Sequence, residues 1–237
     1  LQSSVLKRLL SKTSFSMASQ DVRYYLNGML LEIEDEKING VATDGHRLAF
    51  SSATTTESGL SARNILPRKA VLELSKLLSA TEETVELMVG ASYIDVKSKN
   101  LRFSSKLIDG KYPDYDKVFP TGEPLPLQIS KDLLQSALSR ASVLSNEKYR
   151  GVRFQLTNNK LKLTANNPEQ ESAEEELEVL YGGAELEVGF NIGYLLDVLN
   201  SIESETVNFE FYGEDSSCII KEIDSDNDVY VIMPMRL

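Results

Sequence analysis

Residues 28–44, GMLLEIEDEKINGVATD, decide the fold of this 237-residue chain because their pattern occurs twice. A gapless shift of 123 positions aligns them with residues 151–167, GVRFQLTNNKLKLTANN. In both segments apolar residues alternate at the same places, and a polar turn precedes an aligned lysine, Lys37 or Lys160. Alternation with a period of two predicts β-strands, so each segment is a predicted strand–turn–strand unit.

The segments around this unit recur in the same order. Before it, apolar residues at helical spacing predict helices near residues 5–10 and 133–138, and the first copy has five extra residues within 16–25. After it, residues 68–76 and 191–199 are predicted helices that run into strands opening with Thr84-Val85 and Thr206-Val207. Short strands are predicted at 93–97, 101–105, 218–222 and 229–233. The chain is therefore a predicted α+β protein that contains one domain twice.

A proline-rich stretch separates the two copies. Pro120, Pro124 and Pro126 fall within residues 119–126, where no regular structure is expected. The predicted domains are therefore residues 1–119 and 120–237. In each domain, two helices are expected to pack on one side of antiparallel sheets, because an amphipathic helix buries its apolar face against a sheet layer.

The composition is typical of a soluble globular protein, with 41% hydrophobic and 26% charged residues. The lone Cys218 cannot form an internal disulfide, which fits a reducing compartment, and no apolar run approaches the length of a membrane span. These features, with an N-terminus that lacks a targeting pattern, predict a cytoplasmic protein without a membrane partner. The first methionine is Met17, so we expect the chain to begin partway through a longer protein.

Charge is divided unequally between the copies. The net charge is −11, yet residues 1–119 hold 16 basic and 15 acidic residues, whereas residues 120–237 hold 9 and 21. The first copy gathers basic residues on its predicted helices: Lys7, Arg8 and Lys12 on one, and Arg68, Lys69 and Lys76 on the other. If both helices lie on one side of the sheet, that side is positive and suits a polyanion; ordinary helix-surface cations are the alternative.

No pattern typical of catalysis or metal binding stands out. His46 is the only histidine, and it lies in a strand end and turn with no nucleophile nearby in sequence, so a turn or pocket role is favoured over catalysis. Glycine-rich phosphate loops are missing. The run from Asp224 begins like a calcium loop but has Val229 where glycine must turn the chain, so a hairpin turn is favoured. We therefore predict a protein that is not an enzyme, with no catalytic residue, cofactor or metal.

The C-terminal residues are unusual for a chain end. Residues 230–237, YVIMPMRL, stay largely apolar to the last residue, whereas chain ends are usually frayed and polar. Two interpretations are open: a final strand, or a tail that lines a hydrophobic site. Methionine suits the second, because its flexible thioether adapts to varied partners.

Five segments carry a family resemblance: QDVRYYLNG at 20–28, ATDGHRLA at 42–49, DGKYPDY at 109–115, LSNEK at 144–148 and MPMRL at 233–237. They closely resemble the bacterial DNA polymerase III beta subunits, the replicative sliding clamps. Members of that family have three such domains, and this chain resembles the second and third over its whole length.

The resemblance implies a processivity factor. Six similar domains form a ring with twelve helices inside and a continuous sheet outside, and the ring encircles double-stranded DNA, slides along it and tethers the polymerase. Phosphate contacts suit this task because they carry affinity without sequence information. The implied DNA-facing residues are Arg8, Gln20, Arg23, Tyr24, Tyr25, Arg68, Lys69 and Lys76.

The resemblance also implies a hydrophobic peptide pocket next to the boundary of the two domains. There the replicative polymerase subunit, the clamp loader and other replication or repair proteins would bind through short linear motifs. The implied residues are Leu26, Thr43, Gly45, His46, Arg47, Leu48, Pro113 and Val118, with Asn191, Tyr194, Ser217, Val231, Ile232, Met233, Pro234, Met235 and Arg236. Lys117 stands where the family commonly has arginine and Asp215 where it has an apolar residue, so one pocket edge is expected to be more polar.

The ring interface is a third implied surface. Val143 and Leu144 match the hydrophobic contact that closes a homodimeric ring, and Glu169, Glu171, Glu174 and Glu175 match its acidic surround. A fragment without the N-terminal domain is favoured, although three two-domain chains would also supply six domains. Two other functions stay open: a truncated clamp that serves only as a peptide-binding adaptor, and, less favoured, an enzyme acting on an acidic or sugar substrate.

Overall fold

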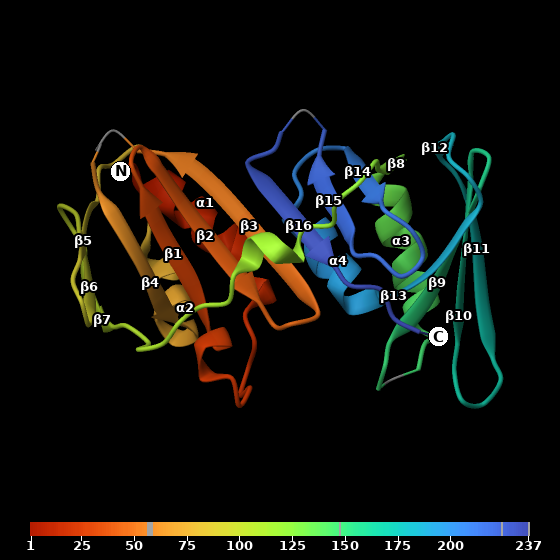
Figure 1. The fold of residues 1–237 in the computed structure, drawn as a ribbon, viewed down its shortest axis with the longest axis horizontal. Coiled ribbons are helices and arrows are strands. Elements are labelled where there is room, and N and C mark those ends of the chain that lie inside the picture. Colours follow the sequence, from red (N-terminus) through yellow and green to blue (C-terminus); the bar gives the residue numbers. More distant parts are fainter. Residues whose placement is uncertain (56–58, 147, 224, 237) are drawn as a thin grey trace. The chain divides into compact units, whose positions relative to one another are not determined.

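The computed structural model describes residues 1–55, 59–146, 148–223 and 225–236 (Figure 1). Asp224, which opens the calcium-loop-like run, and Glu147 and Leu237 of the family segments lie outside the described residues. The chain divides into two compact units, Leu1–Asp114 and Tyr115–Leu237. The sequence placed the domain boundary after Phe119, slightly later than this division.

The first unit contains two helices and seven strands among its described residues. Its four-stranded arrangement has the order β3-β2-β1-β4, and β5, β6 and β7 form a separate three-stranded sheet. All pairings are antiparallel. In chain order the elements are α1 (Ser3–Thr13), η1 (Ser14–Ser16), η2 (Tyr24–Leu26), β1 (Gly28–Glu34), β2 (Lys37–Thr43), β3 (Arg47–Thr54), β4 (Ser61–Pro67), α2 (Arg68–Leu77), β5 (Glu86–Val89), β6 (Tyr93–Lys97) and β7 (Arg102–Lys106).

The second unit repeats this plan. One sheet has the order β11-β10-β9-β13, and the other strands run in the order β12-β8-β14-β15-β16. The elements are η3 (Tyr115–Val118), β8 (Leu125–Ser130), α3 (Lys131–Ser142), β9 (Gly151–Thr157), β10 (Lys160–Asn166), β11 (Ser172–Glu178), β12 (Leu180–Tyr181), β13 (Leu186–Asn191), α4 (Ile192–Ser201), β14 (Thr206–Phe211), β15 (Cys218–Glu222) and β16 (Asp228–Ile232). The predicted α+β fold with antiparallel sheets is confirmed.

The predicted repeat is the β1–β2 hairpin and its counterpart, β9–β10. Glu34 pairs with Lys37 at the end of the first hairpin, and Thr157 pairs with Lys160 at the end of the second. Each turn holds one residue in the left-handed conformation, the first turn residue Asp35 with φ of 52° and the second turn residue Asn159 with φ of 57°, and Asp and Asn adopt this conformation more readily than most residues. Strand order around the hairpins is also the same, β4-β1-β2-β3 and β13-β9-β10-β11.

Two local predictions were wrong. Pro126 lies inside strand β8, although the proline-rich stretch was expected to lack regular structure. The backbone N–H groups of successive strand residues point to opposite edges. The Lys131 N–H, directly after β8, donates to the Glu205 carbonyl directly before β14, so a backbone N–H at position 126 would point away from β14. On that edge β12 pairs only with Leu127 and Gln128, so no ladder bond is lost.

The second wrong prediction concerns Thr84 and Val85. They precede β5 instead of opening it, since the Val85 N–H donates to the Leu1 carbonyl.

Each unit buries the apolar stripes of its helices. In the first, Leu6, Leu9 and Leu10 of α1 and Val71 and Leu74 of α2 are fully buried. They join one hydrophobic cluster with strand residues such as Met29 and Leu31. Helix α1 contacts β2 and β3 while α2 contacts β1 and β4, so both helices cover the same four-stranded sheet (Figure 1).

Candidate functional site

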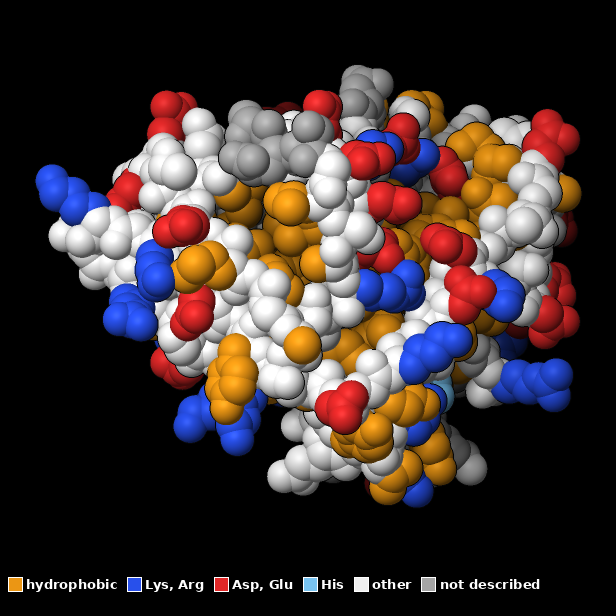
Figure 2. Space-filling view, turned by 60° about the vertical axis from the view of Figure 1, so that its left-hand side comes forward, with side chains coloured by type: hydrophobic (Ala, Val, Ile, Leu, Met, Phe, Trp, Pro, Cys, Tyr) orange, Lys and Arg blue, Asp and Glu red, His pale blue; other side chains and the backbone are white. Residues whose placement is uncertain are grey.

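The helices of the first unit are the basic part of this acidic chain. Helix α1 carries three basic and no acidic residues, and α2 carries three basic residues and one acidic. Helices α3 and α4 carry net charges of +1 and −1. The first two helices together hold a net +5 in a chain of net −11. The face in Figure 2 has acidic and basic side chains interspersed.

Several of these helix cations bind neutral backbone oxygens. Arg8 Nη2 donates to the Ser52 carbonyl at 2.7 Å, and Arg68 Nη1 donates to the Met17 carbonyl at 2.9 Å. A carbonyl orients a guanidinium but carries no net charge, so these bonds leave the positive charge in place. Lys12, by contrast, is only 6% exposed, because the helix turns it toward the interior.

The other two predicted DNA-facing residues of the helices lie at the surface of α2. Lys69 and Lys76 are both exposed. Lys76 Nζ lies 3.0 Å from Glu73 Oε1, and both side chains are largely solvent-exposed, at 71% and 49%. An exposed pair of this kind contributes little stability. The α2 surface therefore presents three cations and one anion.

The five-residue insertion of the first copy folds into an ordered loop between η1 and β1. Asp21 N–H donates to Asn27 Oδ1 at 2.9 Å, and Asn27 Nδ2 donates back to the Asp21 carbonyl at 2.8 Å. Tyr24 and Tyr25 pack edge to face with ring centroids 5.7 Å apart. Gln20 is exposed with φ of 59°, Val22 is 96% exposed and Tyr24 is 57% exposed. The loop thus presents amide and phenol groups on a rigid frame.

Arg23 connects this loop to the β2–β3 turn. Its Nη2 and Nε contact the two carboxylate oxygens of Asp21 at 2.8 and 3.0 Å, and Nη2 also donates to the Asp44 carbonyl at 3.1 Å. Gly45 has φ of 91°, and a Cβ there would lie 2.9 Å from Arg23 Nη1. The positive φ therefore favours glycine at this position, and a side chain there would displace the end of the Arg23 side chain. Arg23, a predicted DNA contact, already has its charge paired within the loop.

The ion pair has a measurable signature. The Arg23 side chain, by hydrogen bonding, lowers the pKa of Asp21 from 3.8 to about 2. We expect Arg23→Gln to return the pKa of Asp21 toward 3.8, and NMR of the side-chain carboxyl during a pH titration measures this directly. The contribution of the pair is complete above the unfolded-state pKa and is lost as pH falls toward 2. Arg63→Gln is the control, because Arg63 pairs with Glu32 instead; an Asp21 pKa near 2 in Arg23→Gln contradicts the assignment.

The β2–β3 turn, which carries four predicted peptide-binding residues, is braced from several sides. Asp44 Oδ1 accepts the backbone N–H groups of His46 and Arg47 at 2.9 and 3.1 Å, while Oδ2 contacts Arg47 Nε at 3.0 Å. Arg47 Nη2 also donates to the Phe15 carbonyl at 2.6 Å. Thr43 N–H donates to Tyr112 Oη at 3.1 Å, and burial raises the pKa of that phenol. His46 is exposed on this fixed turn.

The remaining predicted peptide-binding residues of the first half differ in accessibility. Leu26, Thr43 and Leu48 are at most 8% exposed, so they pack beneath the surface and contribute little to it directly. Pro113 is exposed just before the first unit ends. Val118 is half-buried in η3, which belongs to the second unit.

The C-terminal segment is both a strand and a tail. Val231 and Ile232 are fully buried in β16, which ends at Ile232. Met233, Pro234 and Met235 are then half-buried, and Arg236 is exposed. Met235 N–H donates to the Gly189 carbonyl at 2.8 Å, which pins the tail to β13. The interpretation as a final strand therefore holds up to Ile232, and a tail that lines a hydrophobic site stays a prediction for the residues after it.

Three further predicted peptide-binding residues lie at the start of α4 and before β15. Asn191 caps α4, because its Oδ1 accepts the Tyr194 N–H at 3.2 Å while its Nδ2 donates to the Tyr149 carbonyl at 3.2 Å. Tyr194 and Ser217 are half-buried. The cap thus ties the first turn of α4 to the loop that precedes β9.

The predicted ring-interface residues occupy the end of α3 and the edge strand β11. Val143 is 78% exposed directly after α3, and Leu144 is half-buried beside it. Glu175 binds Arg140 through both carboxylate oxygens at 2.6 and 2.8 Å, and Glu174 lies 2.8 Å from Lys162. Glu169 and Glu171 are exposed before β11. Within the described residues β11 pairs only with β10, which leaves its other edge open.

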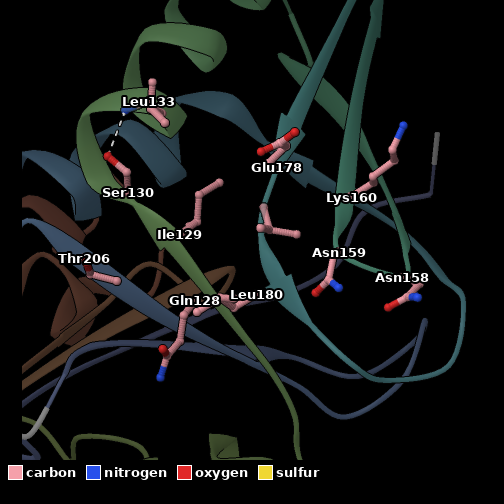
Figure 3. A pocket seen from close by; sticks show the side chains of 11 residues that line it. Gln128, Ile129, Ser130, Leu133, Asn158, Asn159, Lys160, Glu178, Leu180 and Thr206 are labelled. Atoms are coloured by element: carbon pink, nitrogen blue, oxygen red, sulfur yellow. Dashed lines mark hydrogen bonds between the residues drawn. The ribbon is translucent and has the colours of Figure 1, made fainter.

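Sequence reasoning missed a cavity of about 580 Å³ inside the second unit (Figure 3). Ile129 and Leu133 come from β8 and α3, Leu180 from β12, and Asn159 and Lys160 from the β9–β10 hairpin. No motif could have revealed it, since its walls come from segments far apart in the chain. The residues that the structure describes contain no group of three or more His, Cys, Asp or Glu side chains suited to a metal, and no helix long and apolar enough to cross a membrane.

Comparisons with known proteins agree with the internal repeat. Residues 1–114 match the family model for the DNA polymerase III beta subunit, central domain, and residues 116–236 match that for its C-terminal domain. The chain is 49% identical over 235 residues to the beta sliding clamp of Pseudomonas aeruginosa, covering 99% of this chain and 64% of that protein. It is 48% identical over 237 residues to the beta sliding clamp of Escherichia coli K12, covering 100% and 65%.

A solved structure agrees in three dimensions. The crystal structure of the DNA polymerase sliding clamp from Pseudomonas aeruginosa with ligand has a TM-score of 0.98 at 49% identity, over 100% of this chain and 65% of that one. The chain thus spans about 65% of the length of the relatives it matches. Because both halves match consecutive domain models of one family, this chain belongs to the DNA polymerase III beta subunit family, the bacterial sliding clamps.

Proposed function

We propose that this chain forms part of a sliding clamp that encircles duplex DNA and keeps the replicative polymerase on its template. The observation that carries the proposal is the separation of charge: α1 and α2 hold a net +5 within a chain of net −11. Phosphates attract such helices whatever the base sequence, while the acidic remainder repels DNA from other surfaces. A tether that must slide needs this kind of contact.

The side chains fall into three roles under this proposal. Arg8, Arg68, Lys69 and Lys76 supply long-range attraction, since they are the cations of the two basic helices, and Arg8 and Arg68 are oriented by neutral backbone carbonyls. Gln20, Tyr24 and Tyr25 approach the backbone of the duplex from the insertion loop. Arg23 acts by holding that loop against the β2–β3 turn, because its own charge is paired with Asp21.

Ring closure and partner binding complete the proposal. The open edge of β11, with Val143 and Leu144 nearby, suits a subunit contact in a homodimeric ring. Two sets of residues each suit contact with short linear motifs from the polymerase, the clamp loader and repair proteins: the β2–β3 turn in the first unit, and residues 233–236 with the α4 cap in the second. A half-buried methionine tail offers apolar contact that adapts to different anchors.

Salt dependence of DNA binding tests the central claim. The double variant Arg68→Ala/Lys69→Ala should weaken binding to a duplex oligonucleotide and flatten the slope of log K against log salt by roughly 2, because each lost phosphate contact contributes about 0.9. Fluorescence anisotropy between low and moderate salt measures both quantities.

A matched control removes the same charge from a different element. Lys99→Ala/Lys106→Ala lowers the charge of the first unit by the same amount, but these exposed lysines lie at β7 and the turn before it. The control slope should stay near that of the unaltered chain. Equal flattening by both pairs, or binding that ignores salt, would favour a peptide-binding adaptor that does not encircle DNA.

A further inference from the structure

A cavity of about 380 Å³ lies in the second unit where the C-terminal tail meets β13. Its walls include Arg153 of β9, Thr164 of β10, Asn146 and Tyr149 of the preceding loop, and Met235 and Arg236 of the tail. We call it the arginine cavity. Arg153 and Thr164 are paired across β9 and β10, so they face the same side of that sheet.

The cavity concentrates positive charge in an acidic domain. Residues 120–237 hold only 9 basic residues against 21 acidic ones. Two of the nine, Arg153 and Arg236, lie in the wall of this one cavity. The ammonium of Lys148 is 5.1 Å from the centroid of the Tyr149 ring. No acidic side chain is among the described lining residues.

Arg153 is held in place with donors to spare. Its Nη1 donates to Glu187 Oε1, and the other oxygen of Glu187 accepts from Gln155 Nε2 at 2.9 Å. Both oxygens of that carboxylate are therefore occupied, while the guanidinium has five N–H donors and gives Glu187 only one. The Arg153 side chain is 38% exposed, so the remaining donors can reach an incoming group.

The neutral part of the wall suits a short acidic side chain. Tyr149 is 55% exposed and Met235 half-buried, and both offer apolar surface to methylene groups. A polyanion such as DNA is disfavoured here, because β11 of the same sheet carries Glu174, Glu175 and Glu176. A single carboxylate, by contrast, is attracted by the adjacent guanidinium groups and brings no further negative charge near those glutamates.

We propose that the arginine cavity binds an aspartate or glutamate that flanks the hydrophobic anchors of a partner peptide. This inference rests on the proposed peptide-binding function and extends it, because Met235 and Arg236 belong both to the cavity and to the proposed peptide-binding residues. Arg153 is then a specificity-determining residue for acidic flanks.

Four labelled peptides test the proposal, and all share one Leu/Phe-anchored sequence. Two carry a pair of glutamates, one peptide on the N-terminal flank and one on the C-terminal flank, and the other two carry glutamines at the same places. At low salt the glutamate peptide of one flank should bind the full chain about three- to tenfold more tightly than its glutamine counterpart, as charge-assisted hydrogen bonds allow. Arg153→Gln should remove that preference and leave the affinity for the glutamine peptides unchanged.

Two further variants separate contact from net charge. Arg140→Gln removes the same charge from the same unit, and Arg140 is likewise paired to a glutamate, so it should keep the preference. The double variant Arg153→Gln/Glu187→Gln restores the net charge of the chain and should still lack the preference for glutamate peptides. Equal binding of glutamate and glutamine peptides on both flanks overturns the inference while leaving peptide binding intact. Loss of preference in Arg140→Gln also overturns it, and failure of all four peptides to bind contradicts the peptide-binding function itself.

Discussion

Replacing Phe209 by alanine is expected to lower the free energy of unfolding of the second unit by about 3–5 kcal/mol. Phe209 is fully buried in β14, and its ring centroid lies 6.0 Å from that of Phe211 and 6.4 Å from that of Phe154 in β9. The cluster thus connects strands from both sheets of this unit. Deleting the ring removes apolar burial and leaves a cavity that rigid strands fill only in part.

Urea unfolding followed by circular dichroism measures this loss, and hydrogen exchange identifies the unit affected. Amides of β9, β13 and β14 should lose protection first. Leu180→Ala is the control, because Leu180 is 68% exposed and its loss should change stability by less than about 0.5 kcal/mol. A loss below about 1 kcal/mol in Phe209→Ala would mean that the aromatic cluster is not the core of this unit.

Replacing Met233 by alanine is expected to weaken binding of a Leu/Phe-anchored peptide by about ten- to thirtyfold, the effect of losing a central anchor. Met233 is half-buried directly after β16, and its backbone is held between a buried strand and the bond from Met235 to Gly189. Isothermal titration or fluorescence anisotropy gives the affinity.

The choice of residue matters for this experiment. Leu48 is 1% exposed, so Leu48→Ala would destabilise the fold as well as any binding surface. Met88→Ala is a matched control, since Met88 is also half-buried, in β5 of the first unit. Peptide affinity should be unchanged in that variant. Unchanged affinity in Met233→Ala, with a normal thermal melt, would exclude Met233 from the binding surface.

Most of the fold could be predicted because it follows local patterns. Alternation within 28–44 and 151–167 predicted the two hairpins, and helical spacing predicted the four α-helices of the described residues. Pro126 was misjudged because the cost of a proline in a strand depends on which edge its missing N–H faces, and that depends on the register with β12 and β14. Similarly, Thr84 and Val85 are held beside the N-terminal residues of α1 instead of joining β5.

The candidate surfaces were harder to predict than the elements that carry them. Lys12 and Arg8 are four residues apart on one helix, yet Lys12 is buried and Arg8 is half-buried against the Ser52 carbonyl. The cavity walls were missed because each is assembled from several strands and loops. Residue type alone does not say which neighbours a side chain acquires.

The amino-acid sequence by itself determined the duplication, the α+β class, the basic character of the first two helices and the acidic character of the second half, because periodicity and charge are properties of continuous segments. The tertiary structure decided which charges are neutralised and which stay available. Arg23 is paired with Asp21 and binds the Asp44 carbonyl, while Arg153 is fixed by Glu187, 34 residues away, and the tail is pinned to Gly189. These partners meet only on folding, so the pattern of free charge is a property of the folded units.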